Sequence, residues 1–339
     1  MFSNIRSLIF KLDPETAHNL AIKSLKFNFI PNLSDEIKND PLFKNELFGK
    51  EIENPIGMAA GFDKNAEVYN SLFKLGFGFV EVGTITPLKQ YGNPKPRVFR
   101  LVEDEALINR LGFNNNGAKN IVSRIKSNQQ TGILGINVGP NKDTNNREAD
   151  YIECLKTFCD VADYITINIS SPNTENLRNF HDQTKLNNLL KTIEKEKKNL
   201  GSKIPIVVKV SPDINDGEIN KISDVLLDND VEAIIISNTS DSTRDNLTNI
   251  QKHQKGGLSG KPLKAKSTIL ISKFYNLLKG RMKIIGVGGV DSGESAYEKF
   301  LAGANYVQLY TGMVFRGPNI VNLIKKELKE ILSKDGVKN

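Results

Sequence analysis

From residue 54 onward, short apolar runs alternate with longer amphipathic stretches, and this alternation constrains the fold more than any other feature. Eight runs have the length and β-branched content of buried strands, at 55–59, 79–82, 132–138, 164–169, 204–210, 233–237, 283–287 and 306–309. Helix-like stretches follow them near 65–75, 115–128, 147–162, 182–199, 216–228, 262–279, 292–302 and 318–333. Eight strand–helix units predict an α/β protein with a (β/α)8 TIM barrel.

An open, doubly wound sheet is the alternative for such a pattern. Its dinucleotide fingerprint, G-x-G-x-x-G opening a helix after the first strand, is missing from the chain. The 339 residues suit one barrel with a small addition, because barrels routinely occupy 250 residues or more. We therefore predict two parts, an N-terminal helical segment at 1–40 and a barrel domain at 41–339.

The N-terminal segment predicts two amphipathic helices. Apolar residues recur at helical spacing up to Leu12, Asp13-Pro14 resembles an N-cap and first helical residue, and a second apolar face follows. These helices could pack on the barrel, form an apolar cap or lie at a membrane interface. Five basic and five acidic residues do not decide between these roles. Since the chain has no signal-peptide core or apolar run long enough for a span, we expect a cytoplasmic or peripheral membrane protein.

Two loops of the predicted barrel are elaborated. Residues 96–101 and 106–109 flank an acidic turn, which predicts a β-hairpin after the second strand. The loop at 240–257, after the sixth strand, is long and polar, so it is either a mobile lid or a surface excursion. Residues 176–182 form a second possible lid.

The predicted strands end in polar and glycine-rich sequence, which is where barrels place their active sites. The seventh strand ends Gly286-Val-Gly288-Gly289, and the eighth is followed by Thr311-Gly312. Glycines let backbone N–H groups approach a phosphate, and the next helix adds its positive N-terminal dipole. A tight turn explains the glycines alone equally well, but the two loops together favour a phosphorylated cofactor.

Two lysines stand out. Lys209 lies inside an apolar strand, where its burial is costly unless an anion or an ion-pair partner is near. Lys64 follows Gly61-Phe62-Asp63, and it could bind a substrate carboxylate or pair with Asp63.

The sequence lacks the residues that several common kinds of enzyme and binding protein need. No histidine lies at a strand end, which argues against a Ser-His-Asp hydrolase, and paired acids for glycoside hydrolysis are missing there. The three histidines and two cysteines have no metal-ligand spacing, so we expect no metal site. The net charge of +7 permits an anionic partner, but no basic stripe interleaved with aromatics indicates nucleic acid. Amides, hydroxyls and lysines around a phosphate-bearing cofactor fit redox chemistry on a flavin.

Several motifs in order resemble the dihydroorotate dehydrogenase family across nearly the whole chain. They are AAGFDK at 59–64, EVGTITP at 81–87, GNPKPRVFR at 92–100, INRLGF at 108–113, NISSPNT at 168–174, GGLSGKPL at 256–263 and IGVGGV at 285–290. Ser171 occupies the general-base position, as in the membrane-associated, quinone-reducing class 2 enzymes, where class 1 enzymes carry cysteine. The extension at 1–40 also resembles class 2, in which it admits quinone to the flavin.

The resemblance implies that (S)-dihydroorotate is oxidised to orotate in de novo pyrimidine (UMP) biosynthesis. Hydride would pass to one non-covalent FMN, and the electrons to ubiquinone or menaquinone. Ser171 would remove the C5 proton through a relay, for which Thr174 and a water are candidates. Lys64 would hold the substrate carboxylate. The implied substrate-binding residues also include Asn109, Arg110, Leu111, Gly112, Phe113, Asn168, Asn173, Asn238 and Thr239.

For FMN, the resemblance implies that Lys209 stabilises the reduced flavin. The cofactor-binding set would also contain Ala60, Gly61, Phe62, Asp63, Lys64, Thr84, Asn137, Asn168, Ser237, Gly260, Gly289, Tyr310 and Thr311. His18 and Arg100 would face the quinone. Ser237 stands where threonine is expected in many relatives, which keeps the hydroxyl. The resemblance implies a monomer, attached peripherally to the cytoplasmic side of the cell membrane.

Three rival hypotheses differ in acceptor or substrate. A class 1 enzyme using fumarate or NAD is opposed by Ser171. A flavin-dependent tRNA dihydrouridine synthase would need a catalytic cysteine and an RNA-binding domain, but Cys154 and Cys159 lie away from strand ends. A non-catalytic flavin-binding module would leave Lys64, Ser171 and Asn173 without a purpose.

Overall fold

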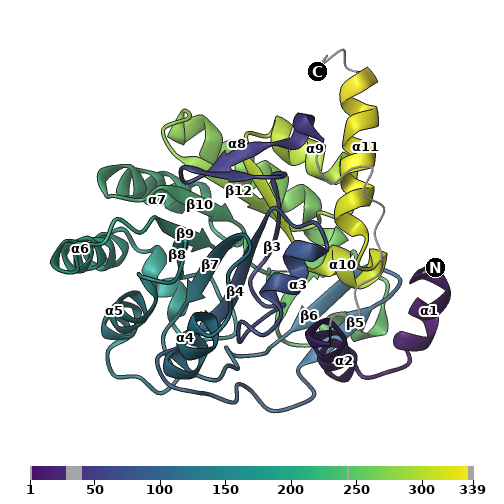
Figure 1. Cartoon of the computed structure of the whole chain (residues 1–339), viewed down its shortest axis with the longest axis horizontal. Helices are drawn as coiled ribbons and strands as arrows, with labels where there is room; N and C mark the ends of the chain where they lie inside the picture. The colour runs from purple at the N-terminus through teal and green to yellow at the C-terminus, as the bar shows by residue number, and fades with distance from the viewer. Residues whose placement is uncertain (1, 28–39, 243, 335–339) are drawn as a thin grey trace.

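The computed structural model describes residues 2–27, 40–242 and 244–334, and its centre is a closed barrel of eight parallel strands (Figure 1). Each barrel strand pairs with its neighbour in sequence, and the last closes on the first. The strands are β3 (Ile56–Met58), β4 (Phe79–Ile85), β7 (Ile133–Val138), β8 (Tyr164–Asn168), β9 (Ile206–Val210), β10 (Ala233–Ile236), β12 (Lys283–Val287) and β13 (Tyr306–Leu309). The predicted (β/α)8 fold is confirmed.

Helices that follow the barrel strands in the chain surround the barrel (Figure 1). They are α3 (Tyr69–Lys74), α4 (Ala118–Lys126), α5 (Arg147–Phe158), α6 (Gln183–Asn199), α7 (Asp216–Asp228), α8 (Lys264–Leu278), α9 (Gly293–Leu301), α10 (Thr311–Arg316) and α11 (Ile320–Lys334). Side chains next to the first turn determine where several of these helices begin. Asn215 and Glu218 form a capping box on α7, and Asp182 accepts the Lys185 N–H at the start of α6.

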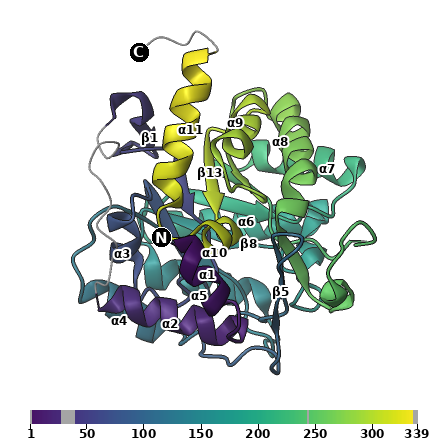
Figure 2. The same ribbon diagram turned by 90° about the vertical axis from the view of Figure 1, so that its right-hand side faces the viewer.

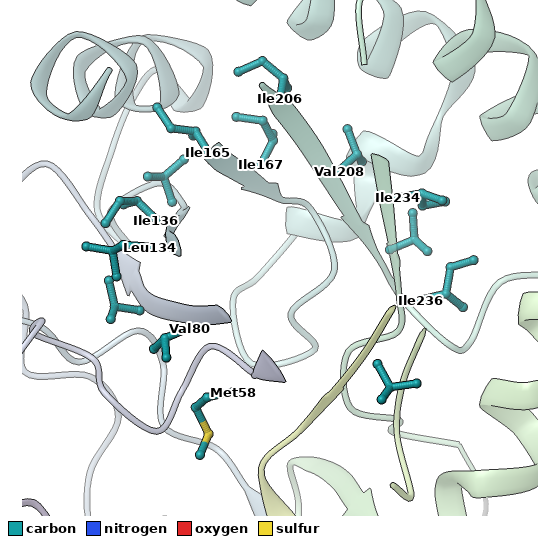
Figure 3. Close-up of a cluster of buried hydrophobic side chains, with 14 of the residues drawn as sticks. Met58, Val80, Leu134, Ile136, Ile165, Ile167, Ile206, Val208, Ile234 and Ile236 are labelled. Atoms are coloured by element: carbon teal, nitrogen blue, oxygen red, sulfur yellow. The ribbon is translucent and has the colours of Figure 1, made fainter. Parts of the chain in front are cut away.

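Side chains alternate along each barrel strand between the helix-covered outside and the interior of the barrel, so these strands contribute to two apolar clusters. One set of side chains packs outward against the helices, including Ile165 and Ile167 of β8 and Ile234 and Ile236 of β10 (Figure 3). The intervening residues fill the barrel, with Tyr164 among the apolar ones. On β7, β8 and β9, this inward series ends in Asn137, Asn168 and Lys209. The barrel interior is therefore apolar at one end and polar at the carboxyl ends of the strands.

A small hairpin of β1 (Asn45–Leu47) and β2 (Lys50–Ile52) contributes Leu47 and Ile52 to the apolar interior cluster. Sequence analysis missed this hairpin, because each of its strands is three residues long and carries charged residues. The predicted hairpin in the second loop is present as β5 (Val98–Leu101) and β6 (Ala106–Asn109). A third strand, β11 (Gly257–Gly260), pairs with β6, so the end of the 240–257 loop is fixed to this hairpin.

The N-terminal helices lie on one side of the barrel, near β5 and α10 (Figure 2). α1 spans Phe2–Ile9 and α2 spans Pro14–Lys26, and the Asp13 side chain accepts the Thr16 N–H at 2.9 Å, as an N-cap does. Residues 28–39 of the predicted segment 1–40 lie outside the described residues. Within the described part of the chain, no helix is long and apolar enough to span a bilayer.

Candidate active site

A cavity, here called the central cavity, opens at the carboxyl ends of the barrel strands. It is lined by most of the residues selected from the sequence: Ala60, Gly61, Lys64, Thr84, Asn109, Leu111, Gly112, Phe113, Asn168, Ser171, Asn173, Lys209, Ser237, Asn238, Thr239, Gly260, Gly289, Tyr310 and Thr311. Asn137 lies beneath the cavity, Phe62 and Asp63 lie to one side, and Arg110 points away from it.

A network of buried amides and hydroxyls forms one wall of the central cavity. Thr84 Oγ1 donates to Asn137 Oδ1 at 2.6 Å, and Asn168 Nδ2 donates to both of these oxygens. Asn137 Nδ2 in turn donates to the carboxylate of Glu81 at 2.8 Å. Because each side chain is fixed by the next, the wall presents amides in one defined orientation.

Glu81 anchors this network inside the barrel, and sequence analysis missed it. It is fully buried, and its carboxylate also accepts hydrogen bonds from Tyr164, Thr166 and Gln308 at 3.1–3.3 Å. The available signal was the same as for Lys209, namely a charge at an inward position of an apolar strand.

Lys209 lies on β9 with 5% of its surface exposed. Burial lowers the pKa of its amine, and the charge of Glu81 opposes that shift. Among the described residues, its Nζ makes no hydrogen bond or ion pair with another side chain. A buried cation with a vacant donor set is suited to an anionic or electron-rich ligand.

Lys64 lies between the central cavity and a second one, and lines both. Its Nζ donates to Gly61 O at 2.7 Å. Burial lowers the pKa of Lys64 to about 8, against the opposing charge of Glu15. The Asp63 carboxylate instead accepts backbone N–H groups of residues 65, 67 and 68, so the pairing of Lys64 with Asp63 is not formed. The amine is therefore available to a ligand carboxylate.

Ser171 follows β8 and is 5% exposed. Its Oγ accepts the Asn173 N–H at 3.2 Å, and Asn173 Nδ2 donates to Asn109 O at 3.0 Å. The hairpin segment that carries Asn109 is thereby held next to the loop after β8, residues 169–174, here called the serine loop. Among the described residues, no carboxylate or imidazole is hydrogen-bonded to Ser171.

The opposite end of the central cavity is built from glycines. Gly288 and Gly289 have φ of 114° and 72°, and a Cβ on Gly289 would lie 2.7 Å from the backbone nitrogen of Lys264 at the start of α8. No side chain caps that helix start. Backbone that can be approached closely, next to the positive end of a helix dipole, is suited to holding a phosphate, and residues 288–289 are here called the glycine cradle.

The second cavity, here called the side cavity, lies between α1, α2 and the barrel, and it contains the predicted quinone residues. His18 makes an edge contact with the Phe62 ring at 5.3 Å, and burial lowers the pKa of His18 to about 3, so it is neutral. Arg100 Nη1 donates to Phe10 O at 3.1 Å. The side cavity shares a wall with the central cavity, made by Lys64, Val98, Leu107, Leu111, Asn114 and Tyr310.

Asn114 and Gly312 also line the central cavity, although neither belongs to the predicted sets of binding residues. Asn114 belongs to the shared wall, and its Oδ1 is buried without a partner among the described residues. Gly312 was visible in the Thr311-Gly312 motif, whereas Asn114 follows directly on the motif at 108–113. In the same described part of the chain, no three His, Cys, Asp or Glu side chains form a group able to hold a metal ion.

A (β/α)8 barrel with a polar cavity at the carboxyl ends of its strands and an adjoining side cavity has the architecture of a barrel enzyme. The family model for dihydroorotate dehydrogenase matches residues 42–332. The chain therefore belongs to the dihydroorotate dehydrogenase family.

Two curated relatives are named dihydroorotate dehydrogenase (quinone). The one from Bartonella tribocorum is 46% identical over 98% of this chain and 93% of the relative, and the one from Idiomarina loihiensis is 44% identical over 97% and 100%. A crystal structure of the dihydroorotate dehydrogenase of Eimeria tenella in complex with ferulenol has a TM-score of 0.92 and 38% identity, covering 96% of this chain and 93% of that one.

Proposed function

We propose that this chain performs its family's reaction with FMN and substrate in the central cavity and with quinone in the side cavity. The reaction is the oxidation of dihydroorotate to orotate in pyrimidine biosynthesis, with a quinone as electron acceptor, the activity named for relatives that match nearly the whole chain. The observation that supports this arrangement best is the wall shared by the two cavities.

The central cavity fits FMN. The glycine cradle at 288–289 would hold the phosphate, and Lys209 would meet the electron-rich edge of the flavin ring. Thr84, Asn137 and Asn168 would hold the ring through their oriented amides and hydroxyl. When bound, FMN supplies the acceptor for hydride and the carrier of electrons to quinone.

Ser171 would take the proton from C5 of dihydroorotate. A serine hydroxyl is a poor base, so it needs a proton relay, for which Thr174 and a water are the candidates. Lys64 would bind the substrate carboxylate, and Asn109, Asn173, Asn238 and Thr239 would contact the ring amides. Phe113, in the cavity wall, would shield the reacting atoms from water. A substrate without these amides would leave buried groups unpaired, which is costly.

Residues 1–40 would form the unit for quinone access, and 41–339 the catalytic domain. α1 and α2 enclose the side cavity, and Leu8 of α1 (67%) and Phe27, directly after α2 (74%), are exposed to the surroundings. Such apolar exposure supports peripheral contact with the cytoplasmic side of the cell membrane, where quinone is dissolved. We propose a monomer with ubiquinone or menaquinone as its acceptor.

An anaerobic titration of the purified, FMN-containing protein with dihydroorotate tests this function. We expect the flavin absorbance to bleach and to return on addition of a short-chain quinone. Return with fumarate but not with quinone would contradict the quinone assignment. A flavin that dihydroorotate does not bleach would contradict the substrate assignment.

A further inference from the structure

Arg178 joins three loops above the central cavity. It lies in the short helix η3 (Leu177–His181), directly after the serine loop. Its Nη1 pairs with Asp241 at 2.6 Å and its Nη2 with Asp213 at 3.3 Å, in the loops that follow β10 and β9. Sequence analysis assigned Arg178 no role.

The same guanidinium also binds the backbone next to the proposed substrate contacts. Its Nε donates to Ser170 O at 3.2 Å, and Nη2 donates to Thr239 O at 3.3 Å. Ser170 precedes Ser171, while Thr239 itself lines the central cavity. Arg178 does not line that cavity, so it acts on these segments from behind. A second link between them is the hydrogen bond from Asn238 Nδ2 to Ser170 Oγ at 2.9 Å.

This set of contacts needs an arginine. The planar guanidinium offers five donors in a fixed fork, which lets one side chain hold two backbone carbonyls and two carboxylates. A lysine could keep the charge and one of the pairs, but it could not keep both carbonyls at their present separation. The ion pair with Asp241 is half-exposed on the acid side, and such pairs contribute little to folding stability. The contacts to the two carbonyls are therefore the distinctive part of the cluster.

We propose that Arg178 is a positioning residue for the oxidation of dihydroorotate, which sets the distance between Ser171 and the Asn238–Thr239 segment across the substrate. The inference rests on the proposed function, because it assumes that both segments contact dihydroorotate. Proton removal requires the base and the substrate to be placed within a fraction of an ångström, so small shifts of either segment slow this step. Electron transfer from the flavin to quinone needs neither segment.

The two half-reactions therefore separate the roles. In anaerobic stopped-flow experiments at saturating dihydroorotate, we expect Arg178→Lys and Arg178→Ala to slow flavin reduction about 10- to 100-fold. Asp241→Asn, which leaves both carbonyl contacts in place, should slow it by less than about threefold. Reoxidation by quinone, FMN content and melting temperature should match the unmodified protein in Arg178→Lys.

Lys273→Ala is the matched control, since Lys273 forms an ion pair with Asp216 at 2.5 Å on the surface, away from the central cavity. It should change none of these quantities. If Arg178→Lys reduces its flavin at the normal rate, the charge suffices and the positioning role is wrong. Equal slowing of both half-reactions, or loss of FMN, would show a general structural role instead. If the unmodified protein is not reduced by dihydroorotate, the proposed function fails, and this inference fails with it.

Discussion

At the scale of single residues, the central cavity contains two buried lysines whose amines have few hydrogen-bond partners within the protein. Lys209 has no partner among the described side chains, and Lys64 has one backbone carbonyl. Asp63, by contrast, is satisfied by three backbone N–H groups. Burying a cation without a hydrogen-bonded counter-ion is costly, which supports the proposal that these two lysines bind anionic or electron-rich groups of the ligands.

Ser171→Ala tests the proposed base. Loss of the hydroxyl should slow flavin reduction by dihydroorotate about 10²- to 10⁴-fold, the usual contribution of a positioned base. FMN should remain bound, because the glycine cradle and Lys209 are unchanged. Rapid-mixing measurements of flavin absorbance check the rate, and the ratio of flavin to protein absorbance checks the content. A normal reduction rate in this variant would remove Ser171 from the mechanism.

Lys64 predicts a pH dependence. Burial lowers the pKa of Lys64 to about 8, so its charge is present below pH 8 and is lost above it. Since the charged amine would bind the substrate carboxylate, kcat/KM for dihydroorotate should fall as pH rises through about 8. Steady-state rates between pH 6 and 10 check this. In Lys64→Arg the guanidinium keeps its charge, so the fall above pH 8 should disappear even if the overall rate is lower.

At the scale of elements, α2 is fixed to the barrel by one buried ion pair. Arg97, next to β5, binds Glu15 through Nε at 3.1 Å and Nη2 at 2.6 Å, and both side chains are less than 15% exposed. This bidentate contact sets how α2 lies over the side cavity. The periodicity of the segment predicted its helices, but not this docking, because the partner residues are 82 positions apart.

The exposed apolar residues Leu8 of α1 and Phe27, directly after α2, predict membrane binding. Replacing Leu8 and Phe27 together with glutamate should lower the partition of the protein onto phospholipid vesicles by about tenfold or more, because two apolar contacts are lost. Flavin reduction by dihydroorotate should be unchanged. Sedimentation with vesicles measures the bound fraction. Ile269→Glu is the control, since Ile269 is 58% exposed on α8, and an equal loss in this variant would contradict a specific membrane face.

At the scale of the whole molecule, the hydrophobic periodicity of the sequence predicted the barrel and its strands. It did not predict contacts between side chains that are far apart in the sequence. Eight strand–helix units determine a barrel, and a barrel brings its strand ends together, so Asn168, Lys209 and Thr311 could be assigned to one site. Side-chain direction is a different matter. Arg110 belongs to a motif of which Asn109, Leu111, Gly112 and Phe113 line the central cavity, yet its guanidinium donates to Pro96 O and Lys255 O. Arg178 was missed because its partners come from three separate loops.

Acid should destabilise the whole molecule through His181. This histidine is 5% exposed, its Nε2 accepts the Ser211 N–H at 3.5 Å, and burial beside Arg178 lowers its pKa to about 4. The pKa of a histidine in an unfolded chain is near 6.5. Between pH 6.5 and 4, the unfolded chain therefore binds a proton at His181 that the folded chain does not bind. The contribution to stability is complete above pH 6.5 and is lost as pH falls toward 4, by up to about 3 kcal/mol.

Urea unfolding at pH 7, 6, 5 and 4 measures this loss. His181→Gln keeps an acceptor near Ser211 but cannot take up a proton, so its free energy of unfolding should fall less steeply between pH 6.5 and 4 than that of the unmodified protein. Burial raises the pKa of the Asp213 carboxyl, but hydrogen bonds with Asp241, Lys266 and Ser240 outweigh this effect and lower it. Such carboxylates lose their contribution to stability in both proteins, so their effect cancels in the difference. The exposed His253→Gln serves as the control. Parallel curves for His181→Gln and the unmodified protein would show that His181 is protonated as readily in the folded chain as in the unfolded one.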